Sequence, residues 1–160
     1  MNKNQNQPEP ERLDQLEEAV AAWGEDLYRF ALLRCASRSN AEDIVQDAFL
    51  KFATAAGPVR YPKAYLYRTV SNACNDLLRR CPLEPIPPTL AAAEEEQLPE
   101  AEARRLAALL DRLPTEQAEV IRLHTFASMR FTEIAQTLDL PVTTVKSRFH
   151  YGIERLKNWM

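Results

Sequence analysis

The chain has 160 residues, of which 46% are hydrophobic and 27% are charged, and its formal net charge is -3. This composition is too apolar for a wholly disordered chain, and it allows one modest core or two small ones. No apolar run approaches the roughly 18 residues of a membrane-spanning helix, and the polar first residues lack the apolar centre of a secretory signal. We therefore expect a cytoplasmic protein without membrane insertion.

The three cysteines, Cys35, Cys74 and Cys81, form no CxxC pair. An odd number of cysteines without that spacing indicates neither a disulfide framework nor a zinc site, so we expect free thiols, with Cys35 and Cys74 packed in helices.

Charge is distributed in blocks along the chain. Residues 57–80 hold five basic side chains and one acidic, whereas residues 81–113 hold three basic and seven acidic. Such blocks predict that different parts of the surface meet different partners.

Three glycines and the lack of alternating apolar segments predict an all-α fold. Residues 1–12, rich in Asn, Gln and Pro, suggest a disordered tail. From Leu13 to Leu33, apolar residues recur at helical spacing, which predicts one long helix or two short ones. Asn40 is placed to cap the following helix, over residues 41–56.

Gly57-Pro58 ends that helix, and Pro62 is suited to the first turn of a third helix that runs to Arg80. Residues 81–98 hold four prolines and no periodicity, as is typical of a linker. The chain therefore divides into two small helical domains, residues 13–80 and 99–160, joined by a flexible linker.

The second domain is expected to contain helices at 99–113 and 116–127, followed by two short helices that flank a three-residue turn. In the last helix, from about Val142 to Trp159, the stripe of Val145, Phe149 and Ile153 packs on the helix before it. Six other residues then project outward: Thr143, Thr144, Lys146, Ser147, Arg148 and Tyr151. This is the pattern of a helix-turn-helix that meets the DNA major groove, although a solvated helix face is the alternative on the pattern alone.

Three segments carry a resemblance to a known family. FTEIAQTLDLPVTTVKSRFHYGIERLK resembles the promoter-reading helix-turn-helix of bacterial sigma factors of the sigma-70 family. LYRFALLRCASRSNAEDIVQDAFLKF resembles the segment that docks on RNA polymerase, and YPKAYLYRTVSNACNDLLRR resembles the segment that opens and reads the -10 element. The order of these segments and the short length of the chain resemble those of the extracytoplasmic-function (ECF) group.

The resemblance implies bacterial core RNA polymerase as a partner, through its beta-prime clamp helices and its beta flap. Five residues are the implied polymerase contacts: Asp43, Gln46, Asp47, Phe49 and Leu50. It also implies promoter DNA and an anti-sigma factor as partners.

Two further residue sets follow from the resemblance. Contacts to the -10 element are expected from Arg60, Lys63, Tyr65, Tyr67, Arg68, Ser71, Asn72, Asn75 and Arg79. Among them Asn72 matches the family best, whereas Tyr65 and Tyr67 have a role as core aromatics as their alternative. Contacts to the -35 element are expected from Thr143, Thr144, Lys146, Ser147, Arg148 and Tyr151.

Several positions depart from the family pattern. Tyr65 stands where many relatives have Trp, Thr143 replaces a Gly, and Arg130 replaces a capping Ser. Residues 151–153, Tyr-Gly-Ile, replace a basic run of the family pattern, which predicts weaker binding of the last helix to DNA phosphates.

Two other functions compete with that of a sigma factor: a stand-alone helix-turn-helix regulator, and a sigma mimic that sequesters a regulator. An enzyme is not expected, since the sequence has no glycine-rich phosphate loop, no Ser/His/Asp set and no acidic cluster at metal spacing. No catalytic residue, cofactor or metal is assigned, and His124 is expected to be structural.

Overall fold

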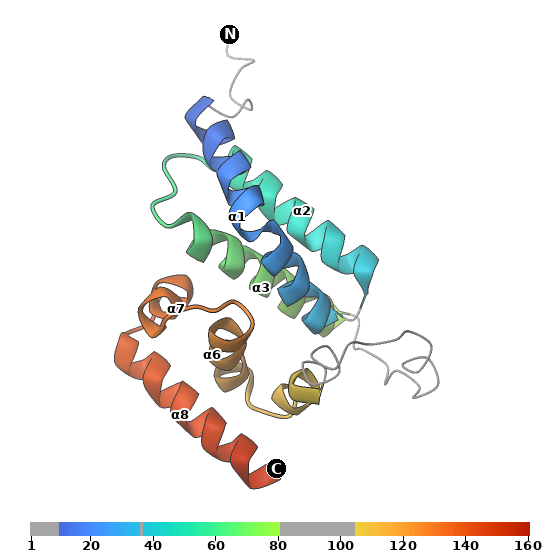
Figure 1. The fold of residues 1–160 in the computed structure, drawn as a ribbon, viewed down its shortest axis with the longest axis vertical. Helices are drawn as coiled ribbons and strands as arrows, with labels where there is room; N and C mark the ends of the chain where they lie inside the picture. Colours follow the sequence, from blue (N-terminus) through green and yellow to red (C-terminus); the bar gives the residue numbers. More distant parts are fainter. Residues whose placement is uncertain (1–9, 36, 81–104) are drawn as a thin grey trace.

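The computed structural model describes residues 10–35, 37–80 and 105–160, which form helices and the turns between them, without a strand. The main helices are α1 (Pro10–Cys35), α2 (Arg38–Thr54), α3 (Pro62–Arg80), α6 (Thr115–Thr125), α7 (Phe131–Leu138) and α8 (Val142–Trp159) (Figure 1). Residues 105–110 form a further helical stretch. The all-α prediction is confirmed, while the expected linker and residues 99–104 lie outside the described residues. Among the described helices, none is both long and apolar enough to cross a membrane.

The first domain packs α1, α2 and α3 around a core of buried apolar side chains. Leu27 and Phe30 of α1 meet Phe52 of α2 and the α3 residues Leu66 and Val70, all of them at most 2% exposed. The apolar stripe from residue 13 to residue 33 belongs to one continuous helix, which settles the choice between one helix and two.

The start of α1 corrects the predicted boundary of the N-terminal tail. The helix begins at Pro10, and Arg12 already contacts the folded domain. Its guanidinium lies 5.3 Å from the centre of the Phe52 ring, donates to the carbonyl of Phe52 at 3.3 Å, and also donates to the carbonyl of Gly57. Gly57 has a φ of +78°, which favours glycine, so Arg12 holds a turn of unusual backbone conformation ahead of α3.

The predicted cap of α2 is wrong by three residues. α2 begins at Arg38, and its N-cap is Ser37, whose hydroxyl accepts a hydrogen bond from the backbone N–H of Asn40 at 3.3 Å. Serine and asparagine are both good caps, so composition alone does not choose between them.

This geometry predicts that Ser37→Ala lowers the free energy of unfolding by about 1 kcal/mol, because an amide of the first turn loses its acceptor. Asn40→Ala is the matched control, and we expect it to change stability by less than about 0.5 kcal/mol. Urea unfolding of both variants measures the difference. If Asn40→Ala destabilised the protein more than Ser37→Ala, the capping residue would be Asn40 and not Ser37.

The second domain contains the helix-turn-helix. α7 and α8 are separated by the three residues 139–141, a turn of the predicted length, and Asp139 adopts a left-handed conformation with φ 55°. The amide of Leu140 then donates to the carbonyl of Ala135 at 3.0 Å, which closes the end of α7. At the other end of α7, the carboxylate of Glu133 accepts from the backbone amide of the N-cap residue Arg130 at 3.2 Å, which is the glutamate half of a capping box.

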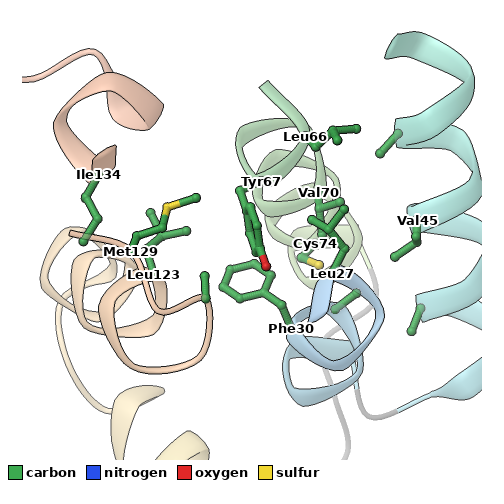
Figure 2. Packing of buried hydrophobic residues seen from close by; sticks show 14 of the residues in the cluster. Leu27, Phe30, Val45, Leu66, Tyr67, Val70, Cys74, Leu123, Met129 and Ile134 are labelled. Carbon is green, nitrogen blue, oxygen red and sulfur yellow. The ribbon is translucent and has the colours of Figure 1, made fainter. Parts of the chain in front are cut away.

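The two domains pack against each other, a feature that the division into linked domains does not predict. α6 and α7 lie against α3, and α8 lies on the far side of them (Figure 1). Buried residues of both domains form one cluster, in which Tyr67 lies between Phe30 of α1 and the side chains of Leu123 and Met129 (Figure 2). The core therefore continues from the first domain into the second.

Cys35 and Cys74 are free and buried within the first domain, as predicted, whereas Cys81 lies outside the described residues. Their sulfur atoms are 3.6 Å apart. Contact with Cys35, followed by burial, raises the pKa of Cys74, so this thiol stays protonated.

Candidate polymerase and nucleic-acid interfaces

One face of α2 collects four of the five residues assigned to polymerase binding. Asp43, Gln46, Asp47 and Leu50 follow the i, i+3, i+4, i+7 spacing of a single helix face, and all four are exposed. Leu50 is 61% exposed, an unusual position for a leucine on an acidic surface. Phe49 is half-buried against the core, where it supports this face without lying on it. We call these four exposed residues the α2 stripe.

Eight of the nine residues assigned to the -10 element belong to α3, where they lie on different faces of the helix. Arg68, Asn72 and Arg79 point to solvent, together with Arg60 in the loop before the helix. Arg79 is paired with Asp76 at 2.8 Å.

Two polar side chains beside this exposed face already have partners within the first domain. The Asn75 side-chain oxygen accepts from Arg34, and the Tyr65 hydroxyl donates to the carbonyl of Lys51 at 3.3 Å. Tyr65 and Asn75 are therefore held in fixed positions next to the exposed donors.

Lys63, Tyr67 and Ser71 lie on the other face of α3, toward the second domain. The Lys63 amine is 3.4 Å from a carboxylate oxygen of Glu133, and the Ser71 hydroxyl donates to Glu119 at 2.7 Å. Tyr67 is 1% exposed, with its ring edge-on to Phe30 at 5.5 Å between ring centres. In this arrangement Tyr67 is a core aromatic. We call these three residues the covered face of α3.

Burial of Tyr67 predicts a pH dependence of stability. Desolvation, and secondly the charge of Asp26, raises the pKa of Tyr67 well above its ordinary value. Above about pH 10 the unfolded chain loses this proton while the folded chain keeps it, so stability falls with a slope approaching about 1.4 kcal/mol per pH unit. We expect Tyr67→Phe to lose this slope; parallel slopes for the two proteins from pH 9 to 11.5 in urea titrations would contradict the assignment.

A hollow of about 360 Å³ lies beside the exposed face of α3. Its walls include Arg60, Tyr61, Tyr65 and Arg68 from the first domain and Gln136 from α7. Aromatic rings beside guanidinium groups suit a nucleobase and its phosphates, since a base can stack while the cations meet the backbone.

α8 presents a polar face to solvent. Thr143, Lys146, Ser147 and Tyr151 are exposed, while Thr144 and Arg148 are half-buried at the margin of this face. The guanidinium of Arg148 is 3.6 Å from a carboxylate oxygen of Glu116 on α6. Arg148, one of the six residues assigned to the -35 element, is thus partly occupied by an ion pair.

His150 belongs to the same exposed face and is absent from the residues assigned by sequence. It is exposed, four residues after Lys146 and three after Ser147, and its ring lies 3.2 Å from Glu154. The helical spacing could have identified it, because residues at i, i+3 and i+4 share a face.

Both halves of the chain match models of known protein regions. Residues 19–81 match the family model described as Sigma-70 region 2, and residues 103–156 match Sigma-70, region 4. The chain is 34% identical over 131 residues to the ECF RNA polymerase sigma factor SigM of Mycobacterium tuberculosis strain H37Rv. The chain belongs to the ECF group of the sigma-70 family. The matched part covers 76% of this chain but 65% of SigM, so this ECF chain spans somewhat less than two thirds of that relative's length.

Two solved structures share the fold of this ECF chain. CnrH in complex with the cytosolic domain of CnrY has a TM-score of 0.67 at 25% identity, over 92% of this chain and 88% of CnrH. The sigma factor RpoE of Bartonella quintana, solved with the anti-sigma factor NepR, has a TM-score of 0.63 at 20% identity, over 91% of this chain and 95% of RpoE.

The departure at residues 151–153 has a packing cause in this ECF chain. Gly152 is buried against α6, and a Cβ atom at this position would lie 2.6 Å from Cδ1 of Ile121. Ile153 is half-buried against the second domain's core, so only position 151 of the three faces solvent. A Cβ at 152 would point at Ile121 of α6, so a basic residue at this buried position would not face solvent as Tyr151 does.

Two ionisable side chains of the second domain have structural roles. His124 stacks on Phe131 with 4.9 Å between ring centres, and its Nδ1 lies 2.9 Å from the carbonyl oxygen of Met129. Arg122 is 5% exposed and donates to Asp111 at 2.7 Å, while burial and then the charge of Arg34 lower its pKa to about 10. No group of three metal-binding side chains occurs in the described ranges.

Proposed function

We propose that this ECF chain is an RNA polymerase sigma factor, which binds core polymerase and directs promoter recognition, promoter opening and transcription initiation. The observation that carries the proposal is the presence, on one chain, of an exposed acidic and apolar stripe on α2 and an exposed polar face on α8. The two faces lie in the two segments that match sigma-70 regions 2 and 4.

The α2 stripe is the proposed docking surface for the beta-prime clamp helices. Leu50 supplies an apolar anchor that costs free energy in water, and Asp43 and Asp47 supply charge for orientation. Phe49 holds the helix on the core beneath them, and the beta flap is the proposed second contact on the polymerase.

DNA contacts are proposed for both domains. Arg60 and Arg68 line the hollow beside α3, and Asn72 and Arg79 lie exposed farther along α3. These positions suit residues that receive an unstacked base and its backbone near the -10 element. On α8, Thr143, Lys146, Ser147 and Tyr151 are the proposed contacts to the -35 element, with Thr144 and Arg148 at the margin.

Run-off transcription tests the function directly. Purified bacterial core polymerase and the chain are mixed with fragmented genomic DNA of the source organism, beside the variants Asn72→Ala and Ser147→Ala. We expect discrete transcripts whose yield falls at least about tenfold in Asn72→Ala, since losing one or two polar contacts to DNA costs about 1–3 kcal/mol. An exposed residue away from these faces, Glu17→Ala, serves as the control.

The competing functions give different results in the same assay. A stand-alone regulator would bind DNA without core polymerase and start no transcript. A sequestering mimic would bind neither core polymerase nor promoter DNA in a productive complex. Catalysis of RNA synthesis is assigned to the polymerase, so no catalytic residue or cofactor is proposed for this chain.

An anti-sigma factor is the proposed regulatory partner. The Bartonella RpoE is described in complex with the anti-sigma factor NepR and CnrH with the cytosolic domain of CnrY, and their folds cover most of this chain. A protein that binds bacterial RNA polymerase and genomic DNA acts in the cytoplasm, which is the location we propose.

A further inference from the structure

Two thiols of the first domain lie in contact although they are far apart in the sequence. Cys35 is the last residue of α1 and Cys74 belongs to α3, and their sulfur atoms are 3.6 Å apart. Both side chains are part of the buried core, into which Cys74 extends from α3 (Figure 2). Neither thiol takes part in the polymerase or DNA contacts proposed above.

Close packing is the simplest explanation of this contact, because a buried cysteine behaves as a small apolar side chain. The geometry also suits a covalent bond. The sulfur atoms of a disulfide are about 2.05 Å apart, so the two sulfurs have to approach each other by only about 1.5 Å from their present 3.6 Å. The folded core already holds the two helices together, so no rearrangement of the chain is needed to bring the thiols into contact.

The surroundings of Cys35 favour its thiolate, which is the form of a cysteine that reacts with oxidants. Contact with Cys74 lowers the pKa of Cys35, burial opposes this shift, and the positive charge of Arg34 lowers the pKa further. Contact with Cys35, followed by burial, raises the pKa of Cys74. The pair therefore combines one thiol that is suited to react first with a second thiol in contact with it.

Burial limits the access of an oxidant to both sulfurs. Cys35 is 1% exposed and Cys74 is 0% exposed. Cys35 ends α1, however, and the last turn of a helix opens more readily than its middle because its final carbonyls lack helical partners. Hydrogen peroxide is small enough to enter through such an opening. We therefore expect a slow oxidation that begins at Cys35.

We propose that Cys35 and Cys74 form a modification site, at which hydrogen peroxide converts the two thiols into an intrachain disulfide. The Cys35 thiolate attacks one peroxide oxygen, the O–O bond breaks, and the products are a Cys35 sulfenic acid and, after protonation, water. The Cys74 sulfur then attacks the Cys35 sulfur, the S–O bond breaks and a second water leaves. Two electrons thus pass from the two sulfurs to the peroxide, and a cellular thiol reverses the reaction by exchange.

The crosslink joins the end of α1 to the helix that carries the proposed -10 contacts. Cys35 and Cys74 are 39 positions apart, so the bond closes a loop that contains the whole of α2. A crosslink of this kind stabilises the folded state by restricting the unfolded chain. Arg34 and Asn75, the neighbours of the two cysteines, already connect the same two helices. The inference goes beyond the proposed function and does not depend on it.

The test uses the full chain with Cys81→Ser, which leaves Cys35 and Cys74 as its two cysteines. The reduced protein is treated with hydrogen peroxide below its melting transition, then denatured with a thiol-blocking reagent and measured by intact mass spectrometry. We expect a loss of about 2 Da, no blocked thiol, and a rise in melting temperature of about 5 °C or more, all reversed by dithiothreitol. The matched control adds Cys35→Ala, which removes one partner and should abolish the rise.

A second pair of variants identifies the thiol that reacts first. In the Cys81→Ser protein, Cys74→Ser keeps a hydroxyl beside Cys35 but removes the second thiol, so a Cys35 sulfenic acid should persist and react with dimedone. Cys35→Ser is the matched counterpart, and we expect at least about fivefold less dimedone label there, because Cys74 lacks the favoured thiolate. Circular dichroism first establishes that both variants are folded.

Each contrary result has a distinct meaning. If the folded Cys81→Ser protein kept both thiols at a peroxide concentration that oxidises the same chain in urea, the modification site would be overturned. A disulfide that lowered the melting temperature would overturn it too, because the native core would then not accommodate the bond. Equal dimedone labelling of Cys74→Ser and Cys35→Ser would overturn the order of reaction. A failure of the proposed function would appear separately, as a lack of transcripts with core polymerase.

Discussion

Leu50→Asp is expected to lower the affinity of the chain for core RNA polymerase by roughly 30-fold or more, because an apolar anchor at an interface centre contributes about 2 kcal/mol or more. The same change should alter the free energy of unfolding by less than about 0.5 kcal/mol, since the side chain is 61% exposed and adds little to the core. Binding to immobilised core enzyme and urea unfolding give the two quantities.

Val20→Asp provides the matched control for Leu50→Asp. Val20 is also an apolar residue on an exposed helix surface, at 48% exposure, but it lies on α1 outside the α2 stripe. The same charge and a similar loss of apolar area should leave polymerase affinity unchanged there. Equal losses at both positions would show that added negative charge, not the α2 stripe, weakens binding.

Gly152→Arg is expected to destabilise the second domain by about 1–3 kcal/mol, even though it adds a basic residue to the run that departs from the family pattern. A Cβ here would lie 2.6 Å from Cδ1 of the buried Ile121 side chain and 3.4 Å from Cβ of Gln117, so Ile121 must move within the core and the contact between α8 and α6 must be repacked. The gain in helix propensity over glycine, up to about 1 kcal/mol, offsets only part of this cost. Affinity for promoter DNA should fall, since the helix that carries Thr143 and Ser147 loses its support.

Tyr151→Arg separates the effect of charge from the effect of packing. Tyr151 is 58% exposed, so arginine fits without moving a helix, and we expect near-wild-type stability and tighter DNA binding. Thermal melting and DNA titration separate the two variants. Gly152→Arg should lower both stability and DNA affinity, whereas Tyr151→Arg should keep the stability and raise the DNA affinity. If Gly152→Arg proved as stable as Tyr151→Arg, the close approach of α6 and α8 would not constrain this position.

Periodicity predicted the helices because each one buries a continuous apolar stripe. The stripe from Val145 to Ile153 and the turn at residues 139–141 located the helix-turn-helix correctly. The cap of α2 was missed because Ser37 and Asn40 have nearly equal capping preference, and the choice depends on where the chain leaves α1.

The contact between domains could not be read from the sequence. Ser71 and Glu119 each fit an ordinary solvated helix surface, and their meeting depends on a relative orientation that no local pattern encodes. Tyr67 was ambiguous for the same reason, since an aromatic residue on an otherwise polar face suits a base pocket and a domain seam equally. The burial of Gly152 likewise depends on how closely α6 approaches α8.

Arg12 gives the beginning of α1 a practical importance for anyone who shortens the protein. Composition suggests a cut before Leu13, and such a cut would delete the guanidinium that holds the carbonyls of Phe52 and Gly57. The turn it holds leads directly to Arg60 and Lys63. A trimmed protein could therefore fold, bind polymerase through α2, and still open promoters poorly because the approach to α3 is no longer fixed.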